Sequence, residues 1–352
     1  MYARRQARNG LGGLVLSGAL LMSAAACGSG GATPVAATPA SPAVSTTAPA
    51  GATPAPSNAP SSGPPTPAPL KSGNVVAWGD DSSGQTDVPA GLTNVVAVAA
   101  GDDFSMALRS DGSVVAWGGS ADPAETQVPA AADGATAIAA GSNFAIALRP
   151  DGTVIGWGDN SSGQLKPPST LKNVVEIAAA GSFALALESD GTVVAWGDDS
   201  NGQTDLPAGL ENVTHVSAGY DFGVASLAGG TVVAWGDKNP TDVASHVTTV
   251  PSGLTGVSVV SAGFSHILAL KSDGTIAAWG GNQDGETTVP QGLHAVAVAA
   301  GGNFSLALES NGTVVGWGGN ESGQATPPSG LAKVLAIGAG GSHALAVVAS
   351  GS

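Results

Sequence analysis

The sequence predicts an all-β fold, and both its composition and its internal repeats support that prediction. The chain has 352 residues, of which 53 are glycine and only 11% are charged. This composition, with valine and alanine throughout, favours short strands joined by tight turns over helices. Seven Trp-Gly pairs recur at spacings of 38 to 44 residues, and such periods with strand patterning are typical of β-propellers. We therefore expect a seven-bladed β-propeller with one Trp-Gly pair in each blade.

Residues 1–27 have the pattern of an export signal. Three arginines within residues 1–9 precede a short apolar run over residues 11–22, and three alanines precede Cys27. The apolar run is shorter than the roughly 20 residues that a membrane-spanning helix needs. We therefore expect a cleaved signal peptide.

Cys27 is the only cysteine, so in an exported protein its thiol has no disulfide partner within the chain. The small residues before it resemble a bacterial lipobox, although Ala24 stands where that motif usually has leucine. We expect a lipidated Cys27 that anchors the protein in the bacterial cell envelope, outside the cytoplasm, with membrane contact only through the lipid. The alternative is an ordinary signal peptide cleaved nearby, which would leave the protein secreted.

Residues 28–72 have the composition of a disordered linker. They contain eleven prolines among alanine, threonine, serine and glycine, and no aromatic residue. Such a segment cannot form a core, and as extended polyproline II it would reach about 140 Å. We expect a stalk that holds a domain away from a membrane.

The first complete repeat illustrates the elements expected in each blade. Strands are expected over residues 94–99, 105–109 and 113–117. Asp111-Gly112 separates the last two, and this pair adopts the positive φ angles of a two-residue hairpin turn. A fourth, outer strand is expected over residues 85–88, because the proline that follows is tolerated at a sheet edge.

Residues 73–352 are expected to form the propeller, and the two ends of this region complement each other. Residues 347–351 stop where the hairpin turn belongs, and residues 72–78 begin on the far side of that turn. We therefore expect the N-terminal strand to complete the C-terminal blade. This arrangement closes the propeller and removes open edge strands.

The tryptophans are expected to be core residues. They occupy one position in every repeat, as packing requires and as a unique binding site would not, and each buries a large apolar area.

The charge of the propeller region limits its partners. It carries 7 basic and 26 acidic residues, a net charge of −19. Nucleic-acid binding depends on Lys and Arg that displace counterions, and an acidic surface repels anionic headgroups. We therefore expect no nucleic-acid partner.

The recurring order of Ala-Gly, an aromatic residue or His, Ala-Leu, Asp-Gly, Val-x-x-Trp-Gly and Gly-Gln resembles the regulator of chromosome condensation repeat. The resemblance covers the chain from Asn74 onward and implies a seven-bladed propeller. The founding activity of that family is nucleotide exchange on a nuclear GTPase at chromatin. It is not expected here, because the export signal and the acidic charge both oppose it.

The chain also resembles the secreted propeller-type β-lactamase inhibitors of actinobacteria, through the Gly-Gln-Thr-x-Val-Pro segments at residues 84–89 and, with Leu206, at residues 202–207. In those proteins aromatic side chains two places after the repeat glycine contact the enzyme. The corresponding residues here are Asp103, Asn143, Asp221, Ser265, Asn303 and Ser342, with one residue missing after Gly181. Because aromatic anchors dominate interface energetics, we expect a different target.

Tyr220 and Phe264 are the aromatic residues that lie outside the signal segment and the two aromatic repeat positions. Each directly follows a repeat glycine, in neighbouring blades. They are either a small binding hot spot or packing variants.

Aspartates follow Trp-Gly in four blades, and one more lies nearby in a fifth: Asp80, Asp81, Asp159, Asp198, Asp199 and Asp237, with Asp122. They form an acidic rim that steers a basic partner, bind cations, or hydrogen-bond their own turn backbone. Together with the aromatic pair, the candidate partner-binding residues are Tyr220, Phe264, Asp103, Asp221, Asp80, Asp81, Asp198 and Asp199.

No catalytic or metal-binding constellation is expected. The sequence has no nucleophile elbow, phosphate loop or EF-hand spacing. His266 and His343 stand where five other repeats carry phenylalanine, and the other histidines show no metal-ligand spacing with them.

We therefore expect a monomeric, non-enzymatic cell-surface lipoprotein without a cofactor, whose acidic face binds an extracytoplasmic protein. The alternative is an inhibitor of a β-lactamase or penicillin-binding enzyme. An enzyme acting on wall polymers is a third reading, which the missing acid–base constellation disfavours.

Overall fold

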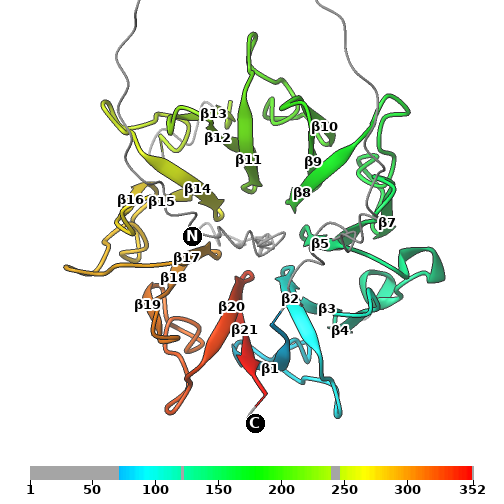
Figure 1. Cartoon of the computed structure of the whole chain (residues 1–352), viewed down its shortest axis with the longest axis vertical. Helices are drawn as coiled ribbons and strands as arrows, with labels where there is room; N and C mark the ends of the chain where they lie inside the picture. Colours follow the sequence, from blue (N-terminus) through cyan, green and yellow to red (C-terminus); the bar gives the residue numbers. More distant parts are fainter. Residues whose placement is uncertain (1–70, 120–122, 239–245, 351–352) are drawn as a thin grey trace, which may run out of the picture. The chain divides into compact units, whose positions relative to one another are not determined.

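The computed structural model describes residues 71–119, 123–238 and 246–350 (Figure 1). Strands dominate this part of the chain, and its only helices are two short 3-10 turns, η1 (Pro123–Thr126) and η2 (Ala130–Ala132). The all-β prediction is therefore confirmed. The predicted signal peptide, the lipidation site Cys27, nearly all of the predicted linker, and Asp122 lie outside the described residues.

Each repeat forms one antiparallel unit of an inner, a middle and a third strand. The inner strands are β2 (Val95–Ala100), β5 (Ala137–Ala140), β8 (Val174–Ala180), β11 (Val213–Ala218), β14 (Val257–Ala262), β17 (Ala297–Ala300) and β20 (Val334–Ala339). The middle strands are β3 (Phe104–Arg109), β6 (Phe144–Leu148), β9 (Phe183–Glu188), β12 (Phe222–Leu227), β15 (His266–Lys271), β18 (Phe304–Leu308) and β21 (His343–Ala349). The third strands are β4 (Val114–Gly118), β7 (Val154–Gly158), β10 (Val193–Gly197), β13 (Val232–Gly236), β16 (Ile276–Gly280), β19 (Val314–Gly318) and β1 (Gly73–Gly79).

The turn between the middle and third strands follows the predicted chemistry. Gly112 has a φ of +83°, a conformation that L side chains rarely adopt. The Ser113 amide donates a hydrogen bond to Asp111 Oδ1 at 2.9 Å. Asp-Gly therefore ends one strand and starts the next in a fixed register.

The inner strands of successive units contact one another along the chain, and β20 of the last unit contacts β2 of the first. Figure 1 shows the inner strands closest to a common centre, with the third strands farther out. The closely packed side chains between units are mostly alanine, valine, leucine and isoleucine.

The N-terminal strand β1 pairs with β21 along its whole length. The register runs from Gly73 opposite Ala349 to Gly79 opposite His343, and a single further pair, Gly73 with Val95, joins β1 to β2. β1 therefore takes the place of a third strand in the last unit, where the sequence predicted it.

The predicted fourth strand over residues 85–88 is wrong, because this segment forms a turn. The Gly84 and Asp87 amides bond to Asp81 O and Gly84 O at 3.2 and 3.1 Å, so they are not available to a strand ladder. Gln85 is fully buried. Its side chain donates to Asp80 Oδ2 at 3.0 Å and accepts from the Ser83 amide at 2.8 Å.

All seven tryptophans are buried, each exposing 5–8% of its surface, so the core assignment is confirmed. Each indole Nε1 also donates to a backbone carbonyl in the loop that precedes its unit, at 2.8 to 3.0 Å. The pairs are Trp78–Gln324, Trp117–Gln85, Trp157–Glu125, Trp196–Gln164, Trp235–Gln203, Trp279–Val247 and Trp317–Glu286. The tryptophans thus tie each connecting loop to the next blade.

Within the three described ranges, we find no helix with the length and apolarity needed to span a bilayer.

Candidate functional site

The strand register gives the propeller two chemically different ends. In the first unit Phe104 lies opposite Gly118 at one end, and the Asp111-Gly112 turn joins the strands at the other. We name these the Trp-Gly end, which carries the turns after each Trp-Gly pair, and the Asp-Gly end, which carries the hairpin turns.

Charge differs sharply between the two ends. Partly or fully exposed carboxylates at the Trp-Gly end belong to Asp80, Asp81, Asp87, Asp103, Asp159, Asp198, Asp199, Asp205, Asp221, Asp237, Asp284 and Glu321. The basic residues described at this end are Lys166 and Lys238, and Lys238 is paired with Asp205. At the Asp-Gly end, exposed carboxylates alternate with Arg109, Arg149, Lys172, Lys271 and Lys333. The Trp-Gly end is therefore the strongly acidic one.

The aspartates after Trp-Gly are also turn acceptors. Asp81 Oδ1 and Asp199 Oδ1 accept the amides of Thr86 and Thr204 at 2.9 Å. The hydrogen bond from the Thr86 side chain, followed by that from its amide, lowers the pKa of Asp81. These side chains therefore stabilise their own turns and remain ionised on the surface.

The described residues contain no cluster of three or more His, Cys, Asp or Glu side chains arranged to hold a metal ion.

Asp103 lies beside Asp80 at the Trp-Gly end. Burial raises the pKa of Asp103, and the neighbouring Asp80 carboxylate raises it further. Asp80, Asp81 and Asp103 thus form one acidic group, whereas Asp198, Asp199 and Asp221 belong to another part of the same end.

The loops between inner and middle strands meet in what we call the inner-loop ring. It consists of the residue after each repeat glycine, or of the glycine itself where that residue is missing: Asp102, Ser142, Gly181, Tyr220, Phe264, Gly302 and Gly341. Backbone hydrogen bonds of 3.0 to 3.3 Å join most neighbours: Asp102 N to Ser142 O, Ser142 N to Gly181 O, Phe264 N to Gly301 O, Gly302 N to Gly340 O and Gly341 N to Gly101 O. Gly181 packs so closely on Tyr220 that a Cβ there would lie 2.4 Å from the Tyr220 carbonyl oxygen.

Tyr220 and Phe264 complete this ring by direct contact. Their ring centroids are 4.8 Å apart and their planes are tilted by 53°. Both side chains are partly exposed. Burial raises the pKa of Tyr220, as do the carboxylates of Asp221, Asp102 and Asp198. The structure therefore places the predicted candidates Tyr220 and Phe264 in contact, and the charges of the candidates Asp221 and Asp198 act on Tyr220.

Sequence reasoning missed Asp102, which is buried in the same ring. Its signal was available, because Asp102 follows the repeat glycine at the position that Tyr220 and Phe264 occupy in their own repeats. Asp284 and Glu321 were also missed, although both lie in turns after a Trp-Gly pair.

The two buried histidines are core residues rather than ligands. His343 Nε2 lies 2.9 Å from Ser105 Oγ, which donates to Gln85 O. His266 Nε2 lies 3.0 Å from Ser305 Oγ, which donates to a carbonyl in the same way. Because each serine hydroxyl donates its hydrogen to a carbonyl, the histidine Nε2–H donates the hydrogen bond to the serine oxygen. Burial lowers the pKa of His266 to about 3 and that of His343 to about 4, so both are neutral near pH 7.

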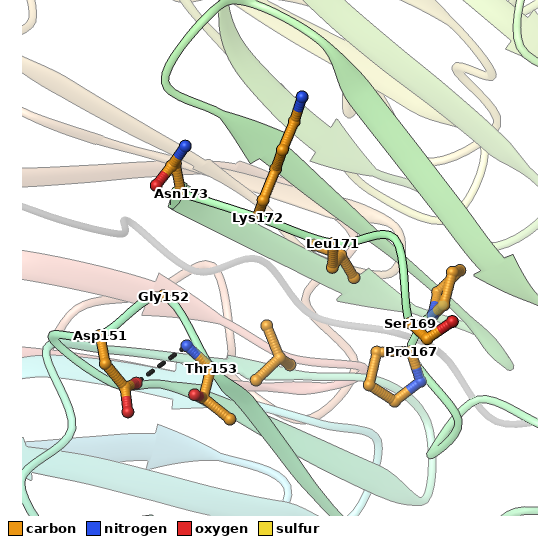
Figure 2. A pocket seen from close by; sticks show the side chains of 10 residues that line it. Asp151, Gly152, Thr153, Pro167, Ser169, Leu171, Lys172 and Asn173 are labelled. Atoms are coloured by element: carbon orange, nitrogen blue, oxygen red, sulfur yellow. Dashed lines mark hydrogen bonds between the residues drawn. The ribbon is translucent and has the colours of Figure 1, made fainter.

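A pocket of about 300 Å³ lies at the Asp-Gly end (Figure 2). Pro167, Leu171 and Lys172 line it, together with Asp151, whose Oδ1 accepts the Thr153 amide at 3.0 Å. Figure 2 shows Lys172 extending away from Asp151, and Lys172 pairs instead with Asp190 at 3.9 Å. None of the predicted candidates lines this pocket.

A smaller pocket, of about 130 Å³, lies at the Trp-Gly end. It is lined by polar groups that include Asp284, Asn303, Glu321 and Ser342. It adds to the acidic surface at that end.

Solved structures show the same fold at low sequence identity. Prp20p from Saccharomyces cerevisiae is 17% identical, with a TM-score of 0.66 over 80% of this chain and 93% of that chain. Human WBSCR16 is 18% identical, with a TM-score of 0.60 over 78% and 100%. The CRINKLY WD40 ectodomain of the Arabidopsis thaliana receptor kinase ACR4 is 19% identical, with a TM-score of 0.57 over 72% and 91%. No curated protein matches the sequence.

A sequence model of the regulator of chromosome condensation (RCC1) repeat matches residues 95–122, 135–164, 174–203, 257–286 and 295–324. Each matched segment begins at or just before an inner strand and ends after the third strand, so the sequence repeat and the structural unit coincide. The chain therefore carries regulator of chromosome condensation repeats.

Proposed function

We propose that the protein is a non-enzymatic cell-surface lipoprotein whose seven-bladed propeller binds an extracytoplasmic protein through its acidic Trp-Gly end. The observation that carries this proposal is the separation of charge between the two ends. Carboxylates dominate one end, whereas at the other they alternate with five basic side chains. A face of one sign attracts a partner of the opposite sign and orients it before contact.

Two contacts support a closed ring of seven blades. β20 of the last unit contacts β2 of the first, and β1 fills the outer place of the last unit by pairing with β21. A closed ring leaves no long open edge, so the molecule is suited to act as a monomeric binding platform.

The entry of the chain into the propeller favours the Trp-Gly end as the outward face. β1 begins at the Asp-Gly end, where Gly73 lies opposite Ala349, and it runs toward the Trp-Gly end. A stalk anchored at Cys27 would therefore attach at the Asp-Gly end. The acidic turns would lie on the side away from the attachment.

Other propellers of this fold bind proteins. Prp20p binds Gsp1p and histones, and yeast RCC1 (Prp20) forms a complex with Kap60. At 17–18% identity these relatives support a protein-binding role in general and not a particular partner.

The inhibitor alternative remains second. It rests on the strings at residues 84–89 and 202–207, which in the structure form turns. The residues two places after the repeat glycine are small or acidic, so the aromatic contacts of that resemblance are missing.

A capture experiment with two matched triple variants tests the proposal. Asp81, Asp159 and Asp199 at the Trp-Gly end each accept a backbone amide through Oδ1. At the Asp-Gly end Asp111, Asp151 and Asp190 do the same. Asparagine keeps the Oδ1 acceptor at all six positions and removes the charge. At Asp159 it also replaces the Oδ2 that accepts hydrogen bonds from the Ser161 hydroxyl and Gln164 Nε2, so the melting temperature of each variant is compared with that of wild type.

Full-length protein and both triple variants are used to capture proteins from the envelope of the producing cell. We expect the wild type and the Asp-Gly-end variant to recover the same partner, and the Trp-Gly-end variant to recover much less of it. Equal recovery by all three proteins would show that the acidic face does not bind the partner. Recovery lost only by the Asp-Gly-end variant would place binding on the other end.

A further inference from the structure

We propose that Tyr220 and Phe264, with the carboxylates of Asp198 and Asp221, form the site at which the propeller receives a basic side chain, lysine or arginine, of its protein partner. This inference rests on the proposed function, because it names the chemistry by which the Trp-Gly end recognises that partner.

The repeats themselves show that packing does not require aromatic side chains here. The residue after the repeat glycine is Asp102, Ser142, Gly302 or Gly341 in four other units. Those units build the same three-stranded sheets with the same hairpin register between middle and third strands. Tyr220 and Phe264 are therefore additions to the inner-loop ring, and both keep part of their surface exposed.

The two rings are held against each other. Their centroids are 4.8 Å apart, and the planes are tilted by 53°. Tyr220 begins the loop into β12 and Phe264 the loop into β15, so the pair bridges two neighbouring units. A cation within about 6 Å of such a ring centroid is attracted by the negative face of the ring. Two rings fixed in place offer that attraction with little loss of side-chain freedom on binding.

Carboxylates add a second attraction at the same place. Asp221 follows Tyr220 directly, and Asp198 lies in the acidic turn of the preceding unit. Their field acts on the Tyr220 hydroxyl, since burial and then the carboxylates of Asp221, Asp102 and Asp198 raise its pKa. A cation bound beside the ring meets the same field with the opposite, favourable sign.

The lysine in the turn after the Trp235-Gly236 pair is already engaged. Lys238 pairs with Asp205 and is exposed. An incoming basic group therefore brings positive charge to a surface that is rich in carboxylates. Because aromatic residues with polar surroundings are typical of interface hot spots, the pair is suited to anchor a partner's lysine or arginine.

The experiment uses the tyrosine content of the chain. Its two tyrosines are Tyr2 and Tyr220, and Tyr2 lies in the expected signal peptide. Processed protein labelled with 3-fluorotyrosine therefore gives a single ¹⁹F signal, from Tyr220. The probes are acetyl-Gly-Arg-Gly amide and acetyl-Gly-Lys-Gly amide. Acetyl-Gly-citrulline-Gly amide is the uncharged control with nearly the same shape as the arginine peptide.

We expect the arginine and lysine peptides to move the Tyr220 signal in a saturable way in the millimolar range. The citrulline peptide should have little effect. Phe264→Ser introduces the residue found at position 142, and we expect about 3- to 30-fold weaker binding from the lost ring. Asp198→Asn should weaken binding several-fold, whereas Asp111→Asn at the Asp-Gly end should not. Because Asp198 Oδ2 accepts from the Ser200 hydroxyl and Gln203 Nε2, the melting temperature of Asp198→Asn is compared with that of wild type.

An equal response to the citrulline peptide would overturn the inference, as would no response of Tyr220 to either basic peptide. Unchanged affinity in Phe264→Ser would overturn it as well. These failures are distinguishable from failure of the proposed function, because the peptide titration needs no natural partner. If the envelope partner is captured through the Trp-Gly end but Tyr220 ignores basic peptides, the inference alone is wrong. If Tyr220 binds them but capture does not depend on that end, the proposed function is wrong.

Discussion

His266 and His343 occupy the position where five other repeats carry phenylalanine, and each bonds a serine hydroxyl in the following unit. Ser105 and Ser305 are therefore matched to the two histidines. Where phenylalanine stands in the preceding unit, the residue equivalent to these serines is Ala145, Ala184, Gly223, Ile267 or Ala344. The buried Nε2 of each histidine thus has a polar partner, whereas the buried Nδ1 atoms have no hydrogen-bond partner in the described part of the structure.

The neutral histidines predict a specific dependence of stability on pH. Burial holds the pKa of His343 in the folded state at about 4, below its ordinary value of 6.5. Between these two values the unfolded chain binds a proton that the folded protein excludes, so the free energy of unfolding falls as pH decreases. From pH 7 to pH 5 we expect His343 to account for a loss of about 2 kcal/mol.

The double variant His343→Phe, Ser105→Ala installs the pair found between other units and should lose this part of the pH dependence. Urea denaturation of wild type and variant at pH 7 and pH 5 measures the difference. If both lose the same stability on acidification, the buried neutral histidine is not responsible.

At the scale of elements, the strands were predictable and the connecting loops were not. Alternating apolar residues and the Asp-Gly pair fix three strands and one turn in each unit, and the structure has them within a few residues of the expected bounds. The Gly-Gln segment has the composition of an edge strand. It forms a turn instead, because the buried Gln85 satisfies polar groups of its own loop and Trp117 bonds the Gln85 carbonyl. The Trp117 bond joins residues that are 32 positions apart in the sequence, and local sequence patterns do not report such a contact.

Trp78 makes β1 the element on which the last unit depends. Its indole is buried and donates to Gln324 O at 2.9 Å, and its strand pairs with β21 over seven residues. Trp78→Ala should lower the free energy of unfolding by about 3–5 kcal/mol. Trp78→Phe, which keeps most of the apolar area and loses the hydrogen bond, should cost about 1–2 kcal/mol.

Chemical denaturation of the two variants beside wild type measures both effects. A Trp78→Ala protein as stable as wild type would show that β1 does not hold the last unit together.

At the scale of the whole molecule, the sequence showed the excess of acidic residues, but it did not show that they gather at one end of the propeller. Each aspartate after Trp-Gly was visible as a turn residue, and the basic residues are scattered along the chain. The register of the strands separates them, because Arg109 and Lys271 end middle strands at one end, whereas Asp80 and Asp198 follow third strands at the other. The gathering of Tyr220, Phe264 and Asp198 likewise depends on the order in which units neighbour each other. The sequence pattern within a single repeat does not show which units are neighbours in space.

The central claim is that the acidic Trp-Gly end receives the partner, and the rate of association tests it most directly. The association rate constant of the captured partner is measured against ionic strength for wild type and the two triple asparagine variants. We predict a rate for wild type and the Asp-Gly-end variant that falls steeply with added salt, and for the Trp-Gly-end variant a rate several-fold lower at low salt with a shallower dependence. Equal salt dependence in all three proteins, or a shallower one only in the Asp-Gly-end variant, would contradict the claim.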